Sequence, residues 1–153
     1  MVVKTERLYG KNQTGRRMYD LIRSTAGDLD DIFINGVSAS DLPLAKWYTI
    51  VKRIPYRIDP VPREIIARPA ILAKYGPQVG IDCKKKSCLM AAALERKKIP
   101  WRLMSTSRRP DKKVSHVFPQ AFLVNRWVNL DATYPFYRPG QPKQVTKAEI
   151  LKG

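Results

Sequence analysis

Apolar residues recur with a helical period in the stretch that follows Asp41. Their spacings of three and four place them on one helical face: Leu44, Trp47, Tyr48 and Val51. Asp41 suits the N-cap of such a helix, and Pro43 suits its first turn, where a proline removes no hydrogen bond that the helix needs. The pattern predicts a helix that begins near Asp41 and packs its apolar face on a core.

A second helical run is rich in alanine and covers residues 89–96. Gly80 and Asp82, a turn former and a good N-cap, stand upstream of it, so Cys83 should lie at the helix N-terminus. Unpaired backbone N–H groups and the positive end of the helix dipole favour a thiolate there over a thiol. The positive charges of the lysines that follow also favour the thiolate: Lys84, Lys85 and Lys86. Cys88 lies inside the predicted helix, just before Leu89 and the alanines, and is interpreted as a small core residue.

Two short apolar runs predict a β-hairpin, residues 117–124 and residues 127–130, with Asn125-Arg126 between them. A two- or four-residue loop at that point places alternate side chains of the two strands on one face. The residues that would share this face are His116, Phe118, Gln120, Asp131 and Thr133.

Cys83, His116 and Asp131 would then supply a nucleophile, a base and a group that orients the base. Two alternatives stay open. Asp131 could serve only in an Asx-type turn at the strand end. For an oxyanion, the Cys83 N–H is the natural first donor and Gln78 is the candidate second donor, although Gln78 could equally be a solvent-exposed residue of a proline–glycine loop.

The remaining elements predict an α+β fold with one domain at residues 28–153. Residues 1–27 are basic and glycine-interrupted, with a short helix expected at residues 16–23, and are interpreted as an arm that docks on the domain or on a partner. A short helix is expected at residues 70–75, the sheet should begin at residues 101–106, and residues 146–152 should form a last helical turn or two. Residues 107–115 form a basic connection beside His116.

An ordered set of motifs resembles the transglutaminase-like superfamily of papain-like cysteine enzymes. In chain order the motifs are Gly80-Ile81-Asp82-Cys83 with Ser87, Lys98-Ile99-Pro100-Trp101-Arg102, His116 at a strand start, and Asp131-Ala132-Thr133 at the next strand end. The segment from Tyr56 to Pro60, continuing through Arg63-Glu64 and Pro69, is similar to the one that precedes the cysteine in small, phage-encoded members. The resemblance covers roughly residues 42–135. It implies a nucleophile helix packed on a small antiparallel sheet and a Cys83–His116–Asp131 triad.

The formal net charge of +16 predicts attraction to polyanions such as nucleic acid, an acidic protein or an anionic cell-wall polymer. Basic residues near the predicted site would bind substrate or polyanion: Lys84, Lys85, Lys86, Arg108 and Arg109. No apolar run approaches the length of a membrane span and no signal peptide opens the chain, so we expect synthesis in the cytoplasm. The two cysteines and one histidine lack paired zinc-ligand spacing, and we expect no metal and no cofactor.

Two functions follow from these observations. The first is acyl transfer on protein or peptide amides through a thioester, ending in crosslinking or in hydrolysis. The alternative is a basic phage structural protein, associated with the virion or with nucleic acid, that retains the fold with little or no catalysis. Strongly salt-dependent DNA binding that survives Cys83→Ala would favour the alternative.

Overall fold

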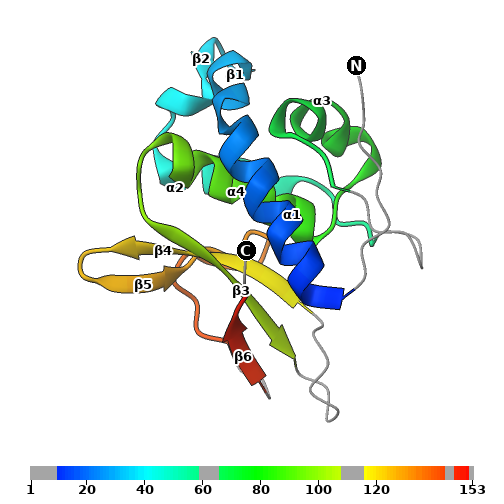
Figure 1. The fold of residues 1–153 in the computed structure, drawn as a ribbon. Coiled ribbons are helices and arrows are strands. Elements are labelled where there is room, and N and C mark those ends of the chain that lie inside the picture. The colour runs from blue at the N-terminus through cyan, green and yellow to red at the C-terminus, as the bar shows by residue number, and fades with distance from the viewer. Residues whose placement is uncertain (1–9, 59–65, 108–115, 144–146, 152–153) are drawn as a thin grey trace.

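The structure is a computed structural model that describes residues 10–58, 66–107, 116–143 and 147–151. The α+β class is confirmed. In the described ranges, four α-helices accompany a four-stranded antiparallel sheet of order β5-β4-β3-β6 and a small hairpin, β1-β2 (Figure 1). The helices are α1 (Gly10–Thr25), α2 (Leu44–Arg53), α3 (Pro69–Val79) and α4 (Cys83–Arg96). The strands are β1 (Phe33–Ile34), β2 (Val37–Ser38), β3 (Trp101–Ser107), β4 (His116–Leu123), β5 (Arg126–Asn129) and β6 (Lys147–Ile150), and two 3-10 turns cover Ala26–Asp31 and Ala39–Asp41.

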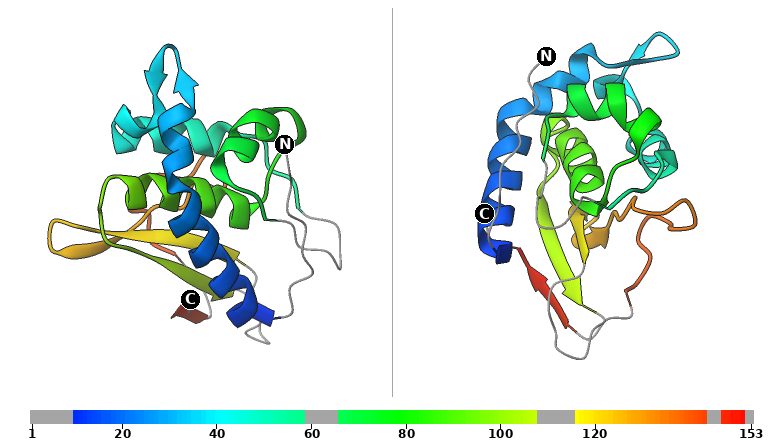
Figure 2. Two further views of the ribbon diagram at one scale, coloured as in Figure 1. Left: turned by 45° about the horizontal axis from the view of Figure 1, so that its top comes forward. Right: turned by 90° about the vertical axis from the view of Figure 1, so that its right-hand side faces the viewer.

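Helix α4 is the centre of the core. Eleven of its fourteen residues are buried, because α1, α2, α3 and the sheet all pack against it. Figure 2 shows α4 between α1 and α2. Side chains also tie the helix to its neighbours: Trp47 Nε1 donates to the Leu89 carbonyl at 3.0 Å, and Ser87 Oγ donates to the Val117 carbonyl at 3.2 Å. The residue that begins α4 is therefore held rigidly relative to β4.

Helix α1 is longer than the predicted helix at residues 16–23, and it contributes to the same core. Met18 and Ile22 are fully buried. The Tyr19 ring stacks on Trp101 with centroids 5.1 Å apart, and its hydroxyl accepts the Leu103 N–H at 2.8 Å. At least this part of the predicted N-terminal arm docks on the sheet.

Three local predictions need correction. Asp41 lies in a 3-10 turn and does not cap α2, whose N-cap position is Pro43. Helix α3 does not end near Tyr75: it continues to Val79, and the Gly80 N–H bonds the Gly76 carbonyl at 2.7 Å. Residues 147–150 form a strand, because they satisfy the open edge of β3 by antiparallel pairing.

The predicted hairpin is confirmed, but its two-residue loop is Val124 and Asn125, one residue earlier than the predicted Asn125-Arg126, because Leu123 pairs with Arg126. Both residues have positive φ, 50° and 61°, as tight hairpin turns require at both central positions. Asparagine tolerates this region, whereas the branched Cβ of valine does not. Val124 is also 93% exposed, so no packing compensates for the backbone strain.

We expect Val124→Asn to raise the free energy of unfolding by about 1 kcal/mol, because it removes a β-branched side chain from the left-handed region. Urea unfolding followed by circular dichroism measures the change. Val37→Asn is the control, since Val37 is an exposed valine in a strand, where the same exchange has no such strain to relieve. A gain of the same size in both variants would mean that the turn conformation is not its cause.

Candidate active site

Cys83 is the first residue of α4, as predicted, and Asp82 is its N-cap. The Asp82 side chain accepts the Lys85 N–H at 3.0 Å and so satisfies one donor of the first turn. The N–H groups of a first helical turn have no carbonyl partner within the helix, so this end of α4 favours negative charge. Cys83 is 8% exposed, which places its thiol at the edge of the core.

Gly80 fixes the path of the chain into α4. Its φ is +78°, and a Cβ there would lie 3.0 Å from the Arg57 Cβ and 3.1 Å from the Pro55 carbonyl oxygen. This close approach lets Ile81 pair with the segment on both sides: its N–H donates to Pro55 at 2.9 Å and its carbonyl accepts from Arg57 at 3.1 Å. The residue two positions before Cys83 is thereby held by strand-like bonds.

His116 begins β4, and Asp131 follows the end of β5, where the Leu130 N–H still bonds the Pro119 carbonyl at 2.9 Å. The predicted shared face brings the two side chains together: His116 Nε2 lies 2.5 Å from Asp131 Oδ2. The Cys83 side chain also contributes to the raised pKa of the His116 ring, which places the thiol close to that ring. Because Nε2 faces the carboxylate, Nδ1 is the nitrogen left for the thiol.

Each oxygen of the Asp131 carboxylate has its own partners. Oδ1 accepts the Thr133 N–H at 3.0 Å and the Thr133 hydroxyl at 2.5 Å, which is the Asx-type turn. Oδ2 faces His116, and it also accepts from Lys143 Nζ at 2.5 Å. The turn and the contact with His116 were alternatives in the sequence, and the structure combines them in one side chain.

The electrostatics of this pair follow from burial and direct bonding. Burial alone would raise the pKa of Asp131, but the hydrogen bond and charge of His116, together with Lys143 and Thr133, lower it to about 2. Burial alone would lower the pKa of His116, but bonds to Asp131 and Cys83 raise it to about 9. The arrangement favours an imidazolium paired with the Asp131 carboxylate.

Two side chains from the helical layer support the Asp131 segment from beneath. Tyr48 in α2 donates its hydroxyl to the Asp131 carbonyl at 2.6 Å. Lys86 in α4 donates Nζ to the Thr133 carbonyl at 2.8 Å and to the Lys52 carbonyl at 3.2 Å. Burial lowers the pKa of Lys86 to about 8. These bonds connect the helix that carries Cys83 to the segment that carries Asp131.

The expected basic surface after Cys83 requires a correction. Lys86 is 1% exposed and Lys85 is also buried, so neither presents its charge to a polyanion. Lys84 pairs with the Asp82 carboxylate at 2.6 Å. Arg108 and Arg109, with the rest of the basic connection, lie outside the described residues. Gln78 is exposed in the last turn of α3, and its role as an oxyanion donor stays a prediction.

Aromatic residues border the site on the Tyr56 side. The Cys83 charge contributes to raising the pKa of Tyr56, after burial, which places this phenol near the thiol. Tyr56 packs on Tyr134 with centroids 4.9 Å apart, and Tyr134 stacks on Phe136 at 5.3 Å. Phe136 is 72% exposed, so an aromatic surface leads from the neighbourhood of Cys83 to solvent.

Sequence reasoning missed Tyr56, Tyr48 and the role of Lys143. Tyr56 opens the segment from Tyr56 to Pro60, but nothing in its local sequence distinguishes it as a site residue. Tyr48 fits the apolar face of α2 as an ordinary core residue. Lys143 is one of 29 basic residues and stands in a proline-rich coil, so nothing in its sequence context distinguishes it.

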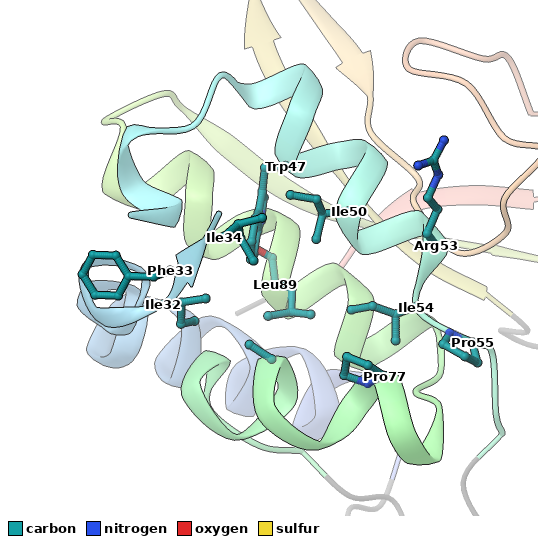
Figure 3. A pocket seen from close by; sticks show the side chains of 11 residues that line it. Ile32, Phe33, Ile34, Trp47, Ile50, Arg53, Ile54, Pro55, Pro77 and Leu89 are labelled. Atoms are coloured by element: carbon teal, nitrogen blue, oxygen red, sulfur yellow. The ribbon is translucent and has the colours of Figure 1, made fainter. Parts of the chain in front are cut away.

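An apolar cavity of about 410 Å³ lies apart from these residues, between α2, α3, α4 and the β1-β2 hairpin (Figure 3). Its lining is mostly aliphatic and aromatic, with Ile34, Trp47, Ile50, Ile54, Pro77 and Leu89. The Arg53 side chain points away from this group in Figure 3. Cys83, His116 and Asp131 do not line the cavity, so it is separate from the candidate site.

Within the described ranges, no cluster of three or more histidine, cysteine or acidic side chains has an arrangement that would hold a metal ion. Across the same part of the chain, no helix combines the length and apolar character that crossing a bilayer requires.

No protein-family model matches the chain, and no curated protein matches it. Among solved structures, it is similar to one described as a "Putative Cysteine Protease from Cytophaga hutchinsonii", with 13% identity and a TM-score of 0.46. The match covers 95% of this chain and 49% of that chain, so this chain spans about half its length. A similarity this low carries no argument about function, and the roles of the residues depend on the geometry of the site.

The chain has a single histidine, so its NMR titration is unambiguous. We expect a midpoint near 9 in the wild type, since bonds to Asp131 and Cys83 hold the proton, and a lower midpoint in Asp131→Asn.

The raised pKa of His116 contributes stability that is complete below pH 6.5 and is lost as the pH rises through 9. The lowered pKa of Asp131 contributes stability that is complete above pH 3.8 and is lost as the pH falls through 2. The difference in the free energy of unfolding between wild type and Asp131→Asn should therefore be largest between pH 3.8 and pH 6.5. A difference that does not change with pH would contradict the pairing of His116 with Asp131.

The two cysteines should differ in reactivity. Burial raises the pKa of Cys88 to about 12, and the residue is 1% exposed. Cys83 lies at a helix N-terminus and close to the His116 imidazole, so we expect iodoacetamide to alkylate Cys83 at least tenfold faster than Cys88 at pH 7. Mass spectrometry of each cysteine peptide over time gives the two rates. Equal rates would remove the case for an activated thiolate.

Proposed function

We propose that this protein is a cysteine enzyme that transfers acyl groups from protein or peptide amides through a thioester on Cys83. The observation that carries the proposal is that Asp131 bonds the His116 ring at 2.5 Å while the Cys83 side chain lies close enough to the same ring to contribute to its raised pKa. A nucleophile, a base and a group that orients the base, placed side by side, are what acyl transfer by a thiol requires. We further propose that the fold is papain-like and of the transglutaminase-like type.

The chemistry assigns one role to each side chain. The Cys83 thiolate attacks the amide carbonyl, and a C–S bond forms as the carbonyl oxygen becomes an oxyanion. His116 gives its Nδ1 proton to the departing amine when the C–N bond breaks, which leaves a thioester and a neutral imidazole. Water or a primary amine then attacks the thioester carbon, and His116 takes the proton of that nucleophile. The C–S bond breaks, the carboxylic acid or the new amide leaves, and Cys83 returns to the thiolate beside an imidazolium. Asp131 keeps its charge throughout and fixes the ring through Nε2.

The oxyanion needs donors that are already in place. The Cys83 N–H is the first, because it belongs to a helix turn whose N–H groups have no carbonyl partner within the helix. Gln78 is proposed as the second.

The acceptor decides whether the reaction is crosslinking or hydrolysis. A lysine amine as acceptor gives an isopeptide crosslink, and water gives a protease or amidase. Labelled casein as acyl donor, with and without a dansylated primary amine, separates the two by fluorescence incorporation against peptide release.

Iodoacetamide labelling of Cys83 from pH 5 to 9, in wild type and His116→Ala, tests the proposal without a known substrate. We expect rapid labelling at low pH in the wild type and loss of that advantage in His116→Ala, because the imidazolium stabilises the thiolate.

Asp131→Asn should keep the circular dichroism spectrum and slow casein turnover by roughly a thousandfold, because the ring loses its orienting carboxylate.

Labelling of Cys83 at the rate of an ordinary thiol, unchanged by His116→Ala, would contradict the proposal. The structural or nucleic-acid-binding alternative would then lead, and salt-dependent DNA binding by Cys83→Ala would support it.

A further inference from the structure

Lys143 contacts the same carboxylate oxygen that orients His116. Its Nζ lies 2.5 Å from Asp131 Oδ2, and His116 Nε2 lies 2.5 Å from that oxygen too. The two nitrogens can therefore be no more than twice that distance apart. This chain carries, at one oxygen of its triad, two groups that can both be cationic.

The ammonium of Lys143 lies in a built environment rather than at the surface. Its side chain is 8% exposed and that of Asp131 is 4% exposed, so solvent screens the pair little. Nζ lies 4.0 Å from the Tyr137 ring centroid and 5.1 Å from that of Phe118. Aromatic faces at these distances stabilise a cation.

A second cation at Oδ2 changes the balance between Asp131 and His116. Two donors from Thr133 already satisfy Oδ1, and His116 alone could satisfy Oδ2. The Lys143 charge repels the His116 imidazolium at short range. It also interacts with the Asp131 carboxylate, which would otherwise attract the imidazolium alone. It therefore opposes the attraction that keeps the proton on His116.

We propose that Lys143 is a positioning residue of the triad, one that holds the Asp131 carboxylate and offsets part of its charge so that His116 can release its proton. The inference depends on the proposed function, because the proton in question passes from His116 Nδ1 to the departing amine nitrogen as the C–N bond breaks. Lys143 stays an ammonium and Asp131 stays a carboxylate throughout that step.

Among the described residues, the other titratable groups that face Asp131 come from the elements packed on it, and apart from His116 none of them bonds its carboxylate. They are His116 from β4, Lys86 from α4 and Tyr48 from α2, with Cys83 acting on the ring of His116. Lys86 bonds the Thr133 carbonyl, and Tyr48 bonds the Asp131 carbonyl, so both act at the backbone. The carboxylate itself is held by His116, Thr133 and Lys143.

The test is the NMR titration of His116 in Lys143→Gln, which can keep a donor to Asp131 and removes the charge. We expect the titration midpoint to rise by about one pH unit above that of the wild type. Lys143→Arg should keep the wild-type midpoint. Lys97→Gln is the matched control, because the Lys97 ammonium is also held by protein acceptors, the carbonyls of Ser40 and Leu42, but at the opposite end of α4 and away from Asp131. An unmoved or lowered midpoint in folded Lys143→Gln would overturn the inference.

A wild-type measurement keeps the inference testable if Lys143→Gln fails to fold. The Nζ resonance of Lys143, followed by ¹⁵N NMR, should shift at the pH where His116 loses its proton, because the two groups share one oxygen. Absence of that shift would overturn the inference.

The two proposals fail in different ways. Labelling of Cys83 that does not depend on His116 overturns the proposed function. An unmoved His116 midpoint in Lys143→Gln, with His116-dependent labelling of Cys83 intact, overturns only the role of Lys143.

Discussion

The carboxylate of Asp131 has lost nearly all of its water, and a buried charge is tolerated only where protein donors replace the solvent. Those donors come from separate parts of the chain: Thr133 beside it, His116 at the start of β4, and Lys143 at the end of a coil. Tyr48 and Lys86 hold the adjoining carbonyls. Satisfying one charge therefore fixes how α4, the sheet and the coil meet, and it assembles the candidate site at the same point.

The features that the sequence predicted well are those with local physical causes. An N-cap aspartate three residues before the N–H that it bonds marks the start of α4, and the period of two in a strand places His116 and Asp131 on one face. The hairpin follows from two apolar runs with a short polar break between them, although its loop lies one residue earlier than that break. Each of these depends on residues a few positions apart, so the pattern carries enough information.

Other features depend on distant partners, and the sequence could not show them. The lysines after Cys83 look solvated until α2 and the Asp131 segment cover Lys86 and offer it two carbonyls. Residues 147–150 alternate polar and apolar side chains, but four residues are too few to distinguish a strand from a helical turn, and they become a strand because β3 has an open edge. Lys143 acquires its contact only when the coil that also contains Tyr137 brings its ammonium to Asp131 and over Phe118 of β4. In each case the deciding contact spans a large sequence separation.

The burial of α4 on nearly every side also determines what oxidation can do to Cys83. Cys88 lies five residues further along the same rigid helix, about 7.5 Å away along the axis by helical rise alone, and its thiol is enclosed in the core. That geometry prevents Cys88 from acting as a resolving thiol. A sulfenic acid formed on Cys83 would therefore persist until an external thiol reduced it, and its reversal depends on the reducing capacity of the surroundings.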